Sequence, residues 1–151
     1  MTEQTSAEQE LLLGIEAGIS QLFRSGRSAL RSYANAFYPE LQPTGFTILR
    51  MIFTCSPAQA GTIIQQTGLD KSAVSRQITV LRDLGLVDTQ PDPLDGRSSL
   101  LVPTALAEER MEIMRQRVKN DYRHRLGEWS ADELATFSAL LDRFNASDPR
   151  A

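Results

Sequence analysis

The sequence predicts a mainly α-helical fold with one small β-hairpin. Residues 71–84 contain neither Gly nor Pro, and Val74, Ile78 and Leu81 recur there at three- and four-residue steps, as in an amphipathic helix. After Gly85 the chain continues as two short extended stretches separated by residues that favour turns. Helical periodicity occupies long stretches at both ends of the chain. Together these three features favour a helical protein in which a hairpin directly follows a short helix.

Two helices are expected in the N-terminal part. Apolar residues return at helical spacing from Leu11 to Phe37, so we expect a long first helix that ends near Pro39. Pro43 suits the first turn of a second helix, because the N–H that it lacks would have no helical partner there. The apolar residues of this second helix are Phe46, Leu49, Ile52 and Phe53.

A third, short helix is predicted to begin in the stretch Ser56-Pro57-Ala58-Gln59, which offers a polar cap and an early proline. Ile63 and Ile64 give this helix a buried side, and Thr67-Gly68-Leu69 ends it with a glycine that tolerates positive φ. Asp70 then stands where an N-cap accepts backbone N–H bonds from the next helix. Two short helices joined by such a turn form a helix-turn-helix unit, although the same residues would suit any small helical bundle.

The helix after Asp70 carries a polar side that suits DNA. Small hydroxyl side chains let a helix approach a duplex closely, and a nearby arginine can reach phosphates or guanine edges. The residues on this side are Ser72, Ser75, Arg76, Thr79 and Arg82. For this helix taken alone, an ordinary solvated polar face explains the pattern equally well.

The hairpin is expected to pair Val87–Pro91 with Ser98–Val102. The connecting stretch, residues 92–97, is rich in residues that make turns. Asp95 is close enough in sequence to orient Arg97 at the tip, and an arginine held out on a loop suits the negative potential of the DNA minor groove. The alternative is a surface turn with an incidental ion pair. A hairpin placed directly after a helix-turn-helix nevertheless favours a winged helix-turn-helix.

Both ends of the chain are expected to build a dimer. Residues 104–126 form a long helix rich in charges, and Ser130 with Glu133 forms a capping box before a last amphipathic helix. Pairing helices of this length across a two-fold axis would bury faces that are otherwise exposed; the alternative is a bundle within one chain. We therefore predict one domain over 1–151, with dimerisation helices at about 8–38 and 104–146 around a winged helix-turn-helix at about 43–103.

Composition limits the function further. The formal net charge is −3, and the stretch 58–103 carries four basic against five acidic residues, so the expected DNA face is nearly neutral and could instead bind a protein. One cysteine and one histidine lie far apart in sequence, and no cluster has metal-ligand spacing, so we expect no enzyme, metal or cofactor. The start of the chain lacks the pattern of a signal peptide, and no apolar run could cross a bilayer. A cytoplasmic protein is expected.

The stretch Leu69-Asp70-Lys71-Ser72-Ala73-Val74-Ser75-Arg76, with Gly85-Leu86-Val87 and Asp92-Pro93-Leu94-Asp95-Gly96-Arg97, resembles the MarR family of bacterial transcription regulators. The resemblance implies a homodimer that places one recognition helix in each half of a pseudo-palindromic operator and a wing in the flanking minor groove. It also implies a sequence-specific regulator that responds to a ligand and acts as a repressor. The implied DNA-contacting residues are Lys71, Ser72, Ser75, Arg76, Gln77, Thr79, Arg82, Asp95, Arg97 and Ser98.

The resemblance further implies a small-molecule effector, often aromatic or anionic, held between the dimer helices and the DNA-binding lobe. Tyr33, Phe46 and Arg50 are the candidate ligand contacts, with His124 on a segment that could border the same pocket. Tyr33 and Phe46 are also ordinary core residues by type, and Cys55, among apolar neighbours, favours a structural role over a redox one. A protein-binding winged helix and an enzyme built on the dimer pocket are the other functions left open.

Overall fold

The computed structural model describes residues 2–94 and 98–147. The chain forms two compact units, one up to Met111 and one from Glu112. The elements are the helices α1 (Thr2–Phe37), α2 (Pro43–Cys55), α3 (Ala60–Thr67) and α4 (Lys71–Asp83), the strands β1 (Val87–Pro91) and β2 (Ser99–Pro103), and the helices α5 (Ala105–Leu126) and α6 (Ala131–Ala146). The predicted mainly helical fold with one hairpin is therefore confirmed.

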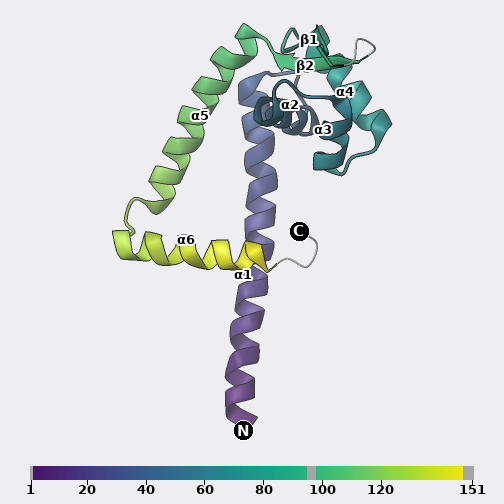
Figure 1. Cartoon of the computed structure of the whole chain (residues 1–151). Helices are drawn as coiled ribbons and strands as arrows, with labels where there is room; N and C mark the ends of the chain where they lie inside the picture. Colours follow the sequence, from purple (N-terminus) through teal and green to yellow (C-terminus); the bar gives the residue numbers. More distant parts are fainter. Residues whose placement is uncertain (1, 95–97, 148–151) are drawn as a thin grey trace. The chain divides into compact units, whose positions relative to one another are not determined.

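In the first unit, α2, α3, α4 and the hairpin gather around the C-terminal end of α1 (Figure 1). Helix α2 lies at the centre, because it contacts α1, α3, α4 and β2. Its residues Phe46, Ile48, Leu49 and Ile52 are fully buried, and the Phe46 ring lies 5.4 Å from that of Phe37 at the end of α1. The core of this unit thus holds the helix-turn-helix against α1.

The turns around α4 form as the sequence predicts. Gly68 ends α3 with φ of 65°, and Gly85 follows α4 with φ of 67°, conformations that a side chain would strain. Asp70 caps α4 by accepting the Ala73 N–H. The polypeptide therefore turns sharply on both sides of α4, which fixes where this helix starts and where the hairpin begins.

The hairpin is antiparallel, with Val87 opposite Pro103 and Pro91 opposite Ser99. Strand β2 begins one residue later than predicted, because Ser98 is used at the base of the turn, where its carbonyl oxygen accepts the Asp92 N–H at 3.1 Å. We use "wing" for this hairpin, residues 87–103.

The predicted start of α3 is wrong. The helix begins at Ala60, and Ser56 caps the end of α2 instead. Ala58 is extended, since its N–H donates to the Leu101 carbonyl at 3.0 Å and its carbonyl accepts the Leu101 N–H at 2.8 Å. This bridge to β2 takes the backbone groups that a helix would otherwise use.

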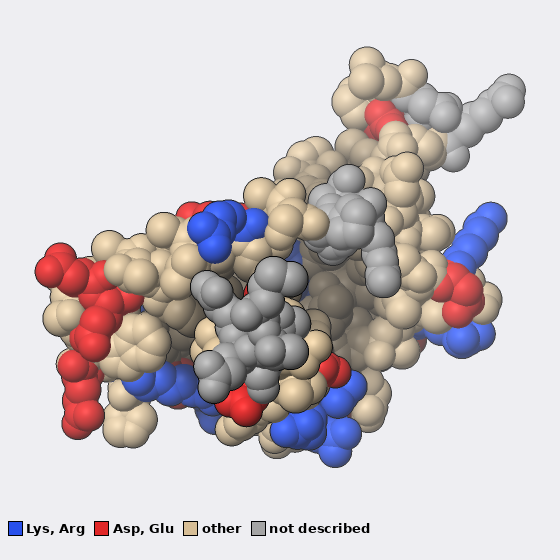
Figure 2. All heavy atoms as spheres, turned by 90° about the horizontal axis from the view of Figure 1, so that it is seen from below, with Lys and Arg blue, Asp and Glu red and all other residues tan. Residues whose placement is uncertain are grey.

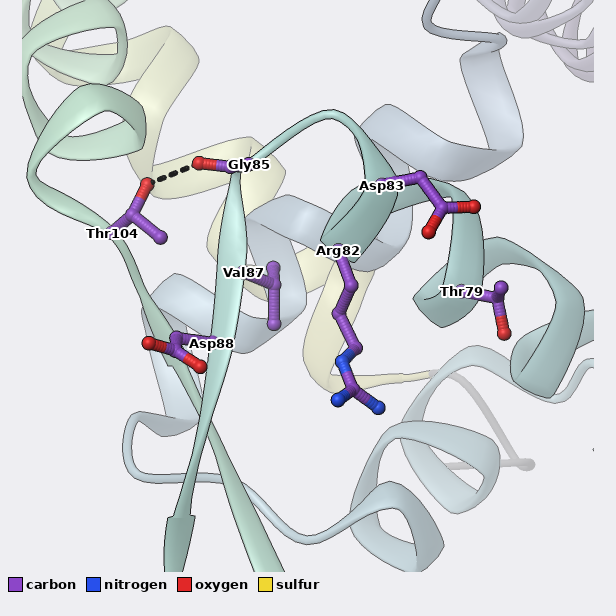
Figure 3. A pocket seen from close by; sticks show the side chains of 7 residues that line it. All are labelled: Thr79, Arg82, Asp83, Gly85, Val87, Asp88 and Thr104. Atoms are coloured by element: carbon purple, nitrogen blue, oxygen red, sulfur yellow. Dashed lines mark hydrogen bonds between the residues drawn. The ribbon is translucent and has the colours of Figure 1, made fainter.

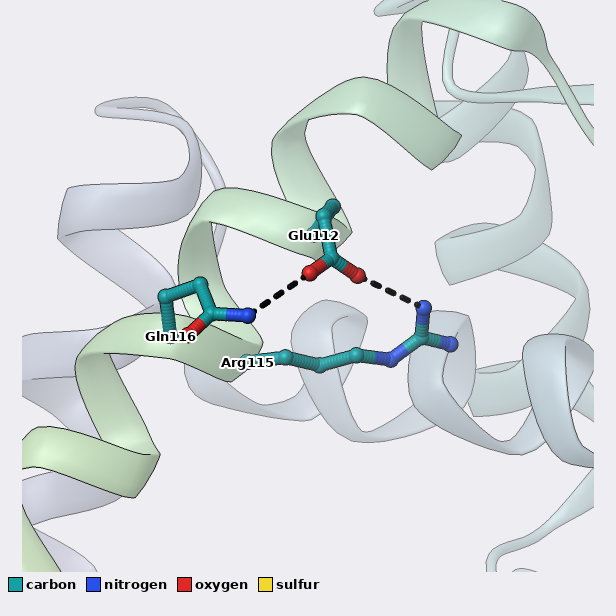
Figure 4. Close-up of polar contacts among 3 residues, drawn as sticks. All are labelled: Glu112, Arg115 and Gln116. Carbon is teal, nitrogen blue, oxygen red and sulfur yellow. Dashed lines mark hydrogen bonds and ion pairs between the residues drawn. The ribbon is translucent and has the colours of Figure 1, made fainter.

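The last part of α5 and the whole of α6 belong to the second unit. On α5, Glu112 forms an exposed ion pair with Arg115 at 3.4 Å and accepts a hydrogen bond from Gln116 at 2.9 Å (Figure 4). The hydrogen bond from Gln116 has the largest effect on Glu112 and lowers its pKa, and the bond from Arg115 lowers it further. The predicted capping box of α6 is confirmed: Ser130 accepts the Glu133 N–H while Glu133 accepts the Ser130 N–H.

Candidate nucleic-acid interface

Helix α4 separates an apolar side from a polar side. Val74 and Leu81 are fully buried and Ile78 is half-buried, so this side packs into the core. The predicted DNA-contacting residues Lys71, Ser72, Ser75, Arg76, Thr79 and Arg82 are all exposed. The helix is thus fixed by its inner side, and its outer side presents three hydroxyl groups and three cations to solvent.

A short chain of hydrogen bonds organises the first turn of α4. The Asp70 carboxylate accepts the Ala73 N–H at 2.8 Å and the Ser72 hydroxyl at 2.5 Å, and the Arg76 guanidinium reaches Ser72 Oγ at 3.4 Å. The bonds from Ser72 and Ala73, more than the Coulomb attraction of Arg76, lower the pKa of Asp70. Asp70 therefore stays ionised at neutral pH and helps to orient Ser72 and, through it, Arg76.

Two predicted contact residues of α4 differ from the rest in their geometry. Gln77 is half-buried, and its Oε1 lies 2.8 Å from where a Cβ would stand on Gly45 of α2, so this side chain lies against the neighbouring helix. The Thr79 hydroxyl donates to the Ser75 carbonyl at 3.2 Å, within its own helix. Gln77 thus packs between helices, while Thr79 stays at the exposed surface.

Where the wing turns, directly after β1, Asp92 is a buried carboxylate with 6% of its surface exposed. It accepts Gln59 Nε2 at 2.9 Å, the Ser98 hydroxyl at 2.8 Å and the Leu94 N–H at 2.9 Å. Ser98, predicted as a DNA contact, is half-buried in this network. The other predicted wing residues, Asp95 and Arg97, lie outside the described residues.

The structure brings Gln59 and Asp92 together although they are 33 residues apart. In the sequence Asp92 is interpreted as a turn residue and Gln59 as part of a helix start, so this pair was not predicted. A "DP" dipeptide indicates a turn but carries no sign of burial. The surplus of acidic residues in the wing was visible in the sequence, but it does not indicate which of them is buried or which residue it contacts.

A hollow of about 540 Å³ lies between the end of α4, the start of the wing and the start of α5. Its lining residues are Thr79, Arg82, Asp83, Gly85, Val87, Asp88 and Thr104. In Figure 3, neither Asp83 nor Asp88 points at the Arg82 guanidinium, and the Thr104 hydroxyl donates to the Gly85 carbonyl at 2.7 Å. The hollow is therefore a polar surface of mixed charge that borders the outer side of α4.

None of the predicted ligand residues lines this hollow, and they differ from one another in burial. Phe46 is 1% exposed and packs on Phe37, which makes it a core residue. Arg50 is exposed on α2, and Tyr33 is half-buried on α1. His124 is exposed on α5, and Cys55 is half-buried with its thiol 3.8 Å from the Met51 sulfur.

Charge is dispersed over the surface. In Figure 2 most of the visible face is neither acidic nor basic, and side chains of both signs lie at several places on it. The formal net charge is −3. Among the described residues, no three His, Cys, Asp or Glu side chains gather as the ligands of a metal ion. No helix of residues 2–94 and 98–147 is long and apolar enough to span a membrane.

Comparison with known sequences identifies two matches. The MarR family model matches residues 41–98, which include α2, α3, α4 and β1. The chain is 32% identical over 105 residues to the uncharacterised HTH-type transcriptional regulator YxaD of Bacillus subtilis (strain 168), which covers 70% of this chain and 73% of YxaD.

Solved structures share the fold. The apo form of wild-type MarR from E. coli superposes with a TM-score of 0.64 at 22% identity, over 83% of this chain and 94% of that one. The MarR family transcription regulator SP03579 gives a TM-score of 0.79 at 18% identity, over 93% and 94% of the two chains. A MarR transcriptional regulator from Methanosarcina mazei Go1 gives 0.68 at 19%, over 87% and 94%.

Proposed function

The chain belongs to the MarR family of DNA-binding transcription regulators, and from this membership we propose that it is a homodimeric, ligand-responsive repressor of a pseudo-palindromic operator. Members of this family are regulators rather than enzymes. The family acts on DNA as dimers, so each subunit would supply one recognition helix and one wing. Its place of action would be the cytoplasm, where bacterial operator DNA lies.

The observation that carries the proposal is the outer side of α4. Its hydroxyl groups and cations are exposed while the opposite side is buried, which is the arrangement that a helix needs to lie in a major groove. We assign the groove contacts to Lys71, Ser72, Ser75, Arg76, Thr79 and Arg82. Among them Arg76 is the best candidate for a base contact, because Ser72 already holds its guanidinium near the first turn of the helix.

The remaining predicted residues receive different roles. Arg97, with Asp95 as its orienting partner, is proposed from the sequence for the minor groove beside the half-site. Gln77 and Ser98 are proposed to support the interface from within, since both are half-buried against protein groups. The near-neutral charge of this face predicts few phosphate contacts and therefore a shallow dependence of affinity on salt.

The proposed dimer rests on apolar side chains that one chain leaves in solvent. On α1, Leu11, Leu12, Ile15, Leu22 and Phe23 are each more than half exposed. On α6, residues 131–146, no residue is buried, and Leu140 and Phe144 are half exposed. Helices that present this much apolar surface are covered by a partner in most soluble proteins, and a second copy supplies matching surfaces.

The proposed response to a ligand follows from the geometry of a dimer on DNA. Both recognition helices must meet successive major grooves at once, so an effector that changes their distance or angle removes one half-site. Tyr33 and Arg50 stay the candidate contacts for an aromatic anion, because α1 and α2 pack on each other and neither side chain is fully buried. Phe46 would support that site from the core.

The test is fluorescence anisotropy on labelled duplexes from the region upstream of the chain's own gene. Wild type should bind one of these duplexes more tightly than unrelated DNA, and Arg76→Ala should weaken that binding about tenfold or more. Arg115→Ala is the matched control, because it removes an equal charge from an exposed site on α5 and should leave affinity unchanged. Specific binding that Arg76→Ala leaves intact would contradict the assignment of α4, and no binding above background would favour a protein-binding module.

A further inference from the structure

The buried carboxylate of Asp92 connects the wing to the helix-turn-helix. Asp92 directly follows β1, and its carboxylate oxygens accept from Ser98 and Leu94 within the hairpin. It also accepts a hydrogen bond from Gln59, which directly precedes α3. A single side chain thus joins the loop end of the hairpin to the start of the first helix of the DNA-binding motif.

Gln59 is used for this connection rather than for its own helix. It occupies the N-cap position of α3, yet its side chain makes no capping bond. Its amide N–H group instead reaches Asp92 Oδ2 at 2.9 Å. Gln59 is itself exposed while Asp92 is buried, so an uncharged donor from the surface satisfies the carboxylate without placing a second charge beside it.

The neighbouring residue reinforces the connection. Ala58 pairs with Leu101 of β2 through two backbone bonds of 3.0 and 2.8 Å. Residues 58 and 59 therefore hold both strands of the wing, β2 through the backbone and the end of β1 through Asp92. The open end of the hairpin, beside the Val87–Pro103 pair, is fixed separately, because Thr104 donates its hydroxyl to the Gly85 carbonyl and its N–H to the Leu86 carbonyl.

We propose that Asp92 is a positioning residue, and that the Gln59–Asp92–Ser98 network, here called the latch, sets the angle of the wing relative to α3 and α4. The inference rests on the proposed function, since the angle matters only when helix and wing meet adjacent grooves of one duplex. The latch then determines whether the wing reaches the DNA that flanks the half-site while α4 lies in the major groove.

Energetics favour a closed latch over an open one. A buried carboxylate that loses one of its donors keeps its desolvation cost with less to offset it, and bonds to a charged acceptor are among the stronger ones in proteins. Replacing Gln59 by Glu would place a second carboxylate at 2.9 Å from the first, and the repulsion between them would push the two segments apart. The matched change Gln66→Glu adds the same charge to an exposed site on α3.

The first test is hydrogen exchange measured by mass spectrometry on the free protein. Gln59→Glu should speed exchange of the wing amides about tenfold while α1, α2 and α4 keep wild-type protection. Gln66→Glu should change nothing. Adding Asp92→Asn to Gln59→Glu should restore slow exchange, because the Asn amide can donate to the new carboxylate. Equally faster exchange throughout the protein, or exchange that Asp92→Asn does not slow again, would overturn the latch. If Gln59→Glu does not fold, Gln59→Met removes the donor with little change in shape.

The second test measures DNA binding with two duplexes, one ending at the half-sites and one extended by flanking base pairs. Wild type should bind the extended duplex more tightly, and Gln59→Glu should lose about tenfold on that duplex while keeping its affinity for the shorter one. Equal losses on both duplexes would contradict a role in positioning the wing. Wild type that binds neither duplex would instead contradict the proposed function, and the exchange experiment would still decide whether the latch exists.

Discussion

At the scale of single residues, Asp70 shows how one exposed carboxylate organises a helix end. It accepts the Ala73 N–H, which α4 itself leaves without a helical partner, and the Ser72 hydroxyl, which in turn approaches Arg76. Its negative charge also faces the positive end of the helix dipole. The same side chain therefore stabilises α4 and orients two of its proposed DNA contacts.

Removing this cap should be measurable as a loss of stability. Asp70→Ala is expected to lower Tm by a few degrees at pH 7, since the first turn of α4 loses its capping acceptor. The bonds from Ser72 and Ala73 lower the pKa of Asp70 below its usual 3.8, so its contribution is complete above that value and fades as pH falls through the lower, folded-state pKa. Thermal melts from pH 7 to pH 2.5 should show the gap between wild type and variant closing only below about pH 4.

The control for this prediction lies at the other end of α4. Asp83→Ala removes an acidic residue from the C-terminal turn, where a negative charge opposes the helix dipole. Its Tm should match or slightly exceed that of wild type. An equal loss of Tm in both variants would show that general charge, rather than capping, explains the effect.

Residues with local roles were predictable, and residues with distant partners were not. Asp70, Gly68, Gly85 and the Ser130 capping box act within a few positions of themselves, so the sequence pattern was sufficient. Asp92 acts on Gln59 across 33 positions, and only the folded chain brings the two together. The burial of Gln77 beside Gly45 likewise depends on how closely α4 packs on α2.

At the scale of elements, the contact of α2 with α4 depends on Gly45. A Cβ at this position would stand 2.8 Å from Gln77 Oε1 and 2.8 Å from Leu41 Cδ1, and Leu41 is buried. Gly45 thus permits the two helices to approach until Gln77 fills the space between them. The outer side of α4 is placed by this inner contact.

A larger residue at Gly45 should therefore destabilise the protein. Gly45→Val is expected to cost about 1–3 kcal/mol of unfolding free energy through overpacking, measured by urea denaturation. Gln77→Ala in the same chain should return part of that loss, because it empties the space that the new side chain needs. Gly61→Val on α3 is the control, since no atom lies within 4 Å of its added Cβ, and its stability should be unchanged or higher. Identical losses at Gly45 and Gly61 would rule out steric crowding as the cause.

The prediction of elements succeeded for their type and order but missed some boundaries, since α1 begins at Thr2 rather than at about residue 8 and β2 begins at Ser99 rather than at Ser98. The end of α1, the helices α2 and α4 and the hairpin all lie close to their predicted places, because capping residues, glycines and apolar spacing agree there. The start of α3 was placed too early, because Ala58 gives its backbone bonds to Leu101. A bridge to a strand 43 positions later leaves no local pattern.

At the scale of the whole molecule, the exposed apolar residues of α1 and α6 carry the proposed homodimer. Ile15 and Leu22 of α1 are seven residues apart, share one side of the helix and are 55% and 59% exposed. Leu22→Glu should raise the dimer dissociation constant about tenfold or more, measured by analytical ultracentrifugation. Ser28→Glu adds the same charge to an exposed position on another side of α1, and should leave the dimer intact. A dimer that is insensitive to Leu22→Glu would place the interface elsewhere.

The central claim is that two copies of α4 read two half-sites on one duplex, and a change of half-site spacing tests it most directly. Once the bound operator has been located, five base pairs inserted between its half-sites would turn one major groove to the opposite face of the duplex. The proposed homodimer predicts that anisotropy titrations then give the affinity of a single half-site, whereas an insertion of ten base pairs costs less because the faces realign. Unchanged affinity after the five-base-pair insertion would contradict the account.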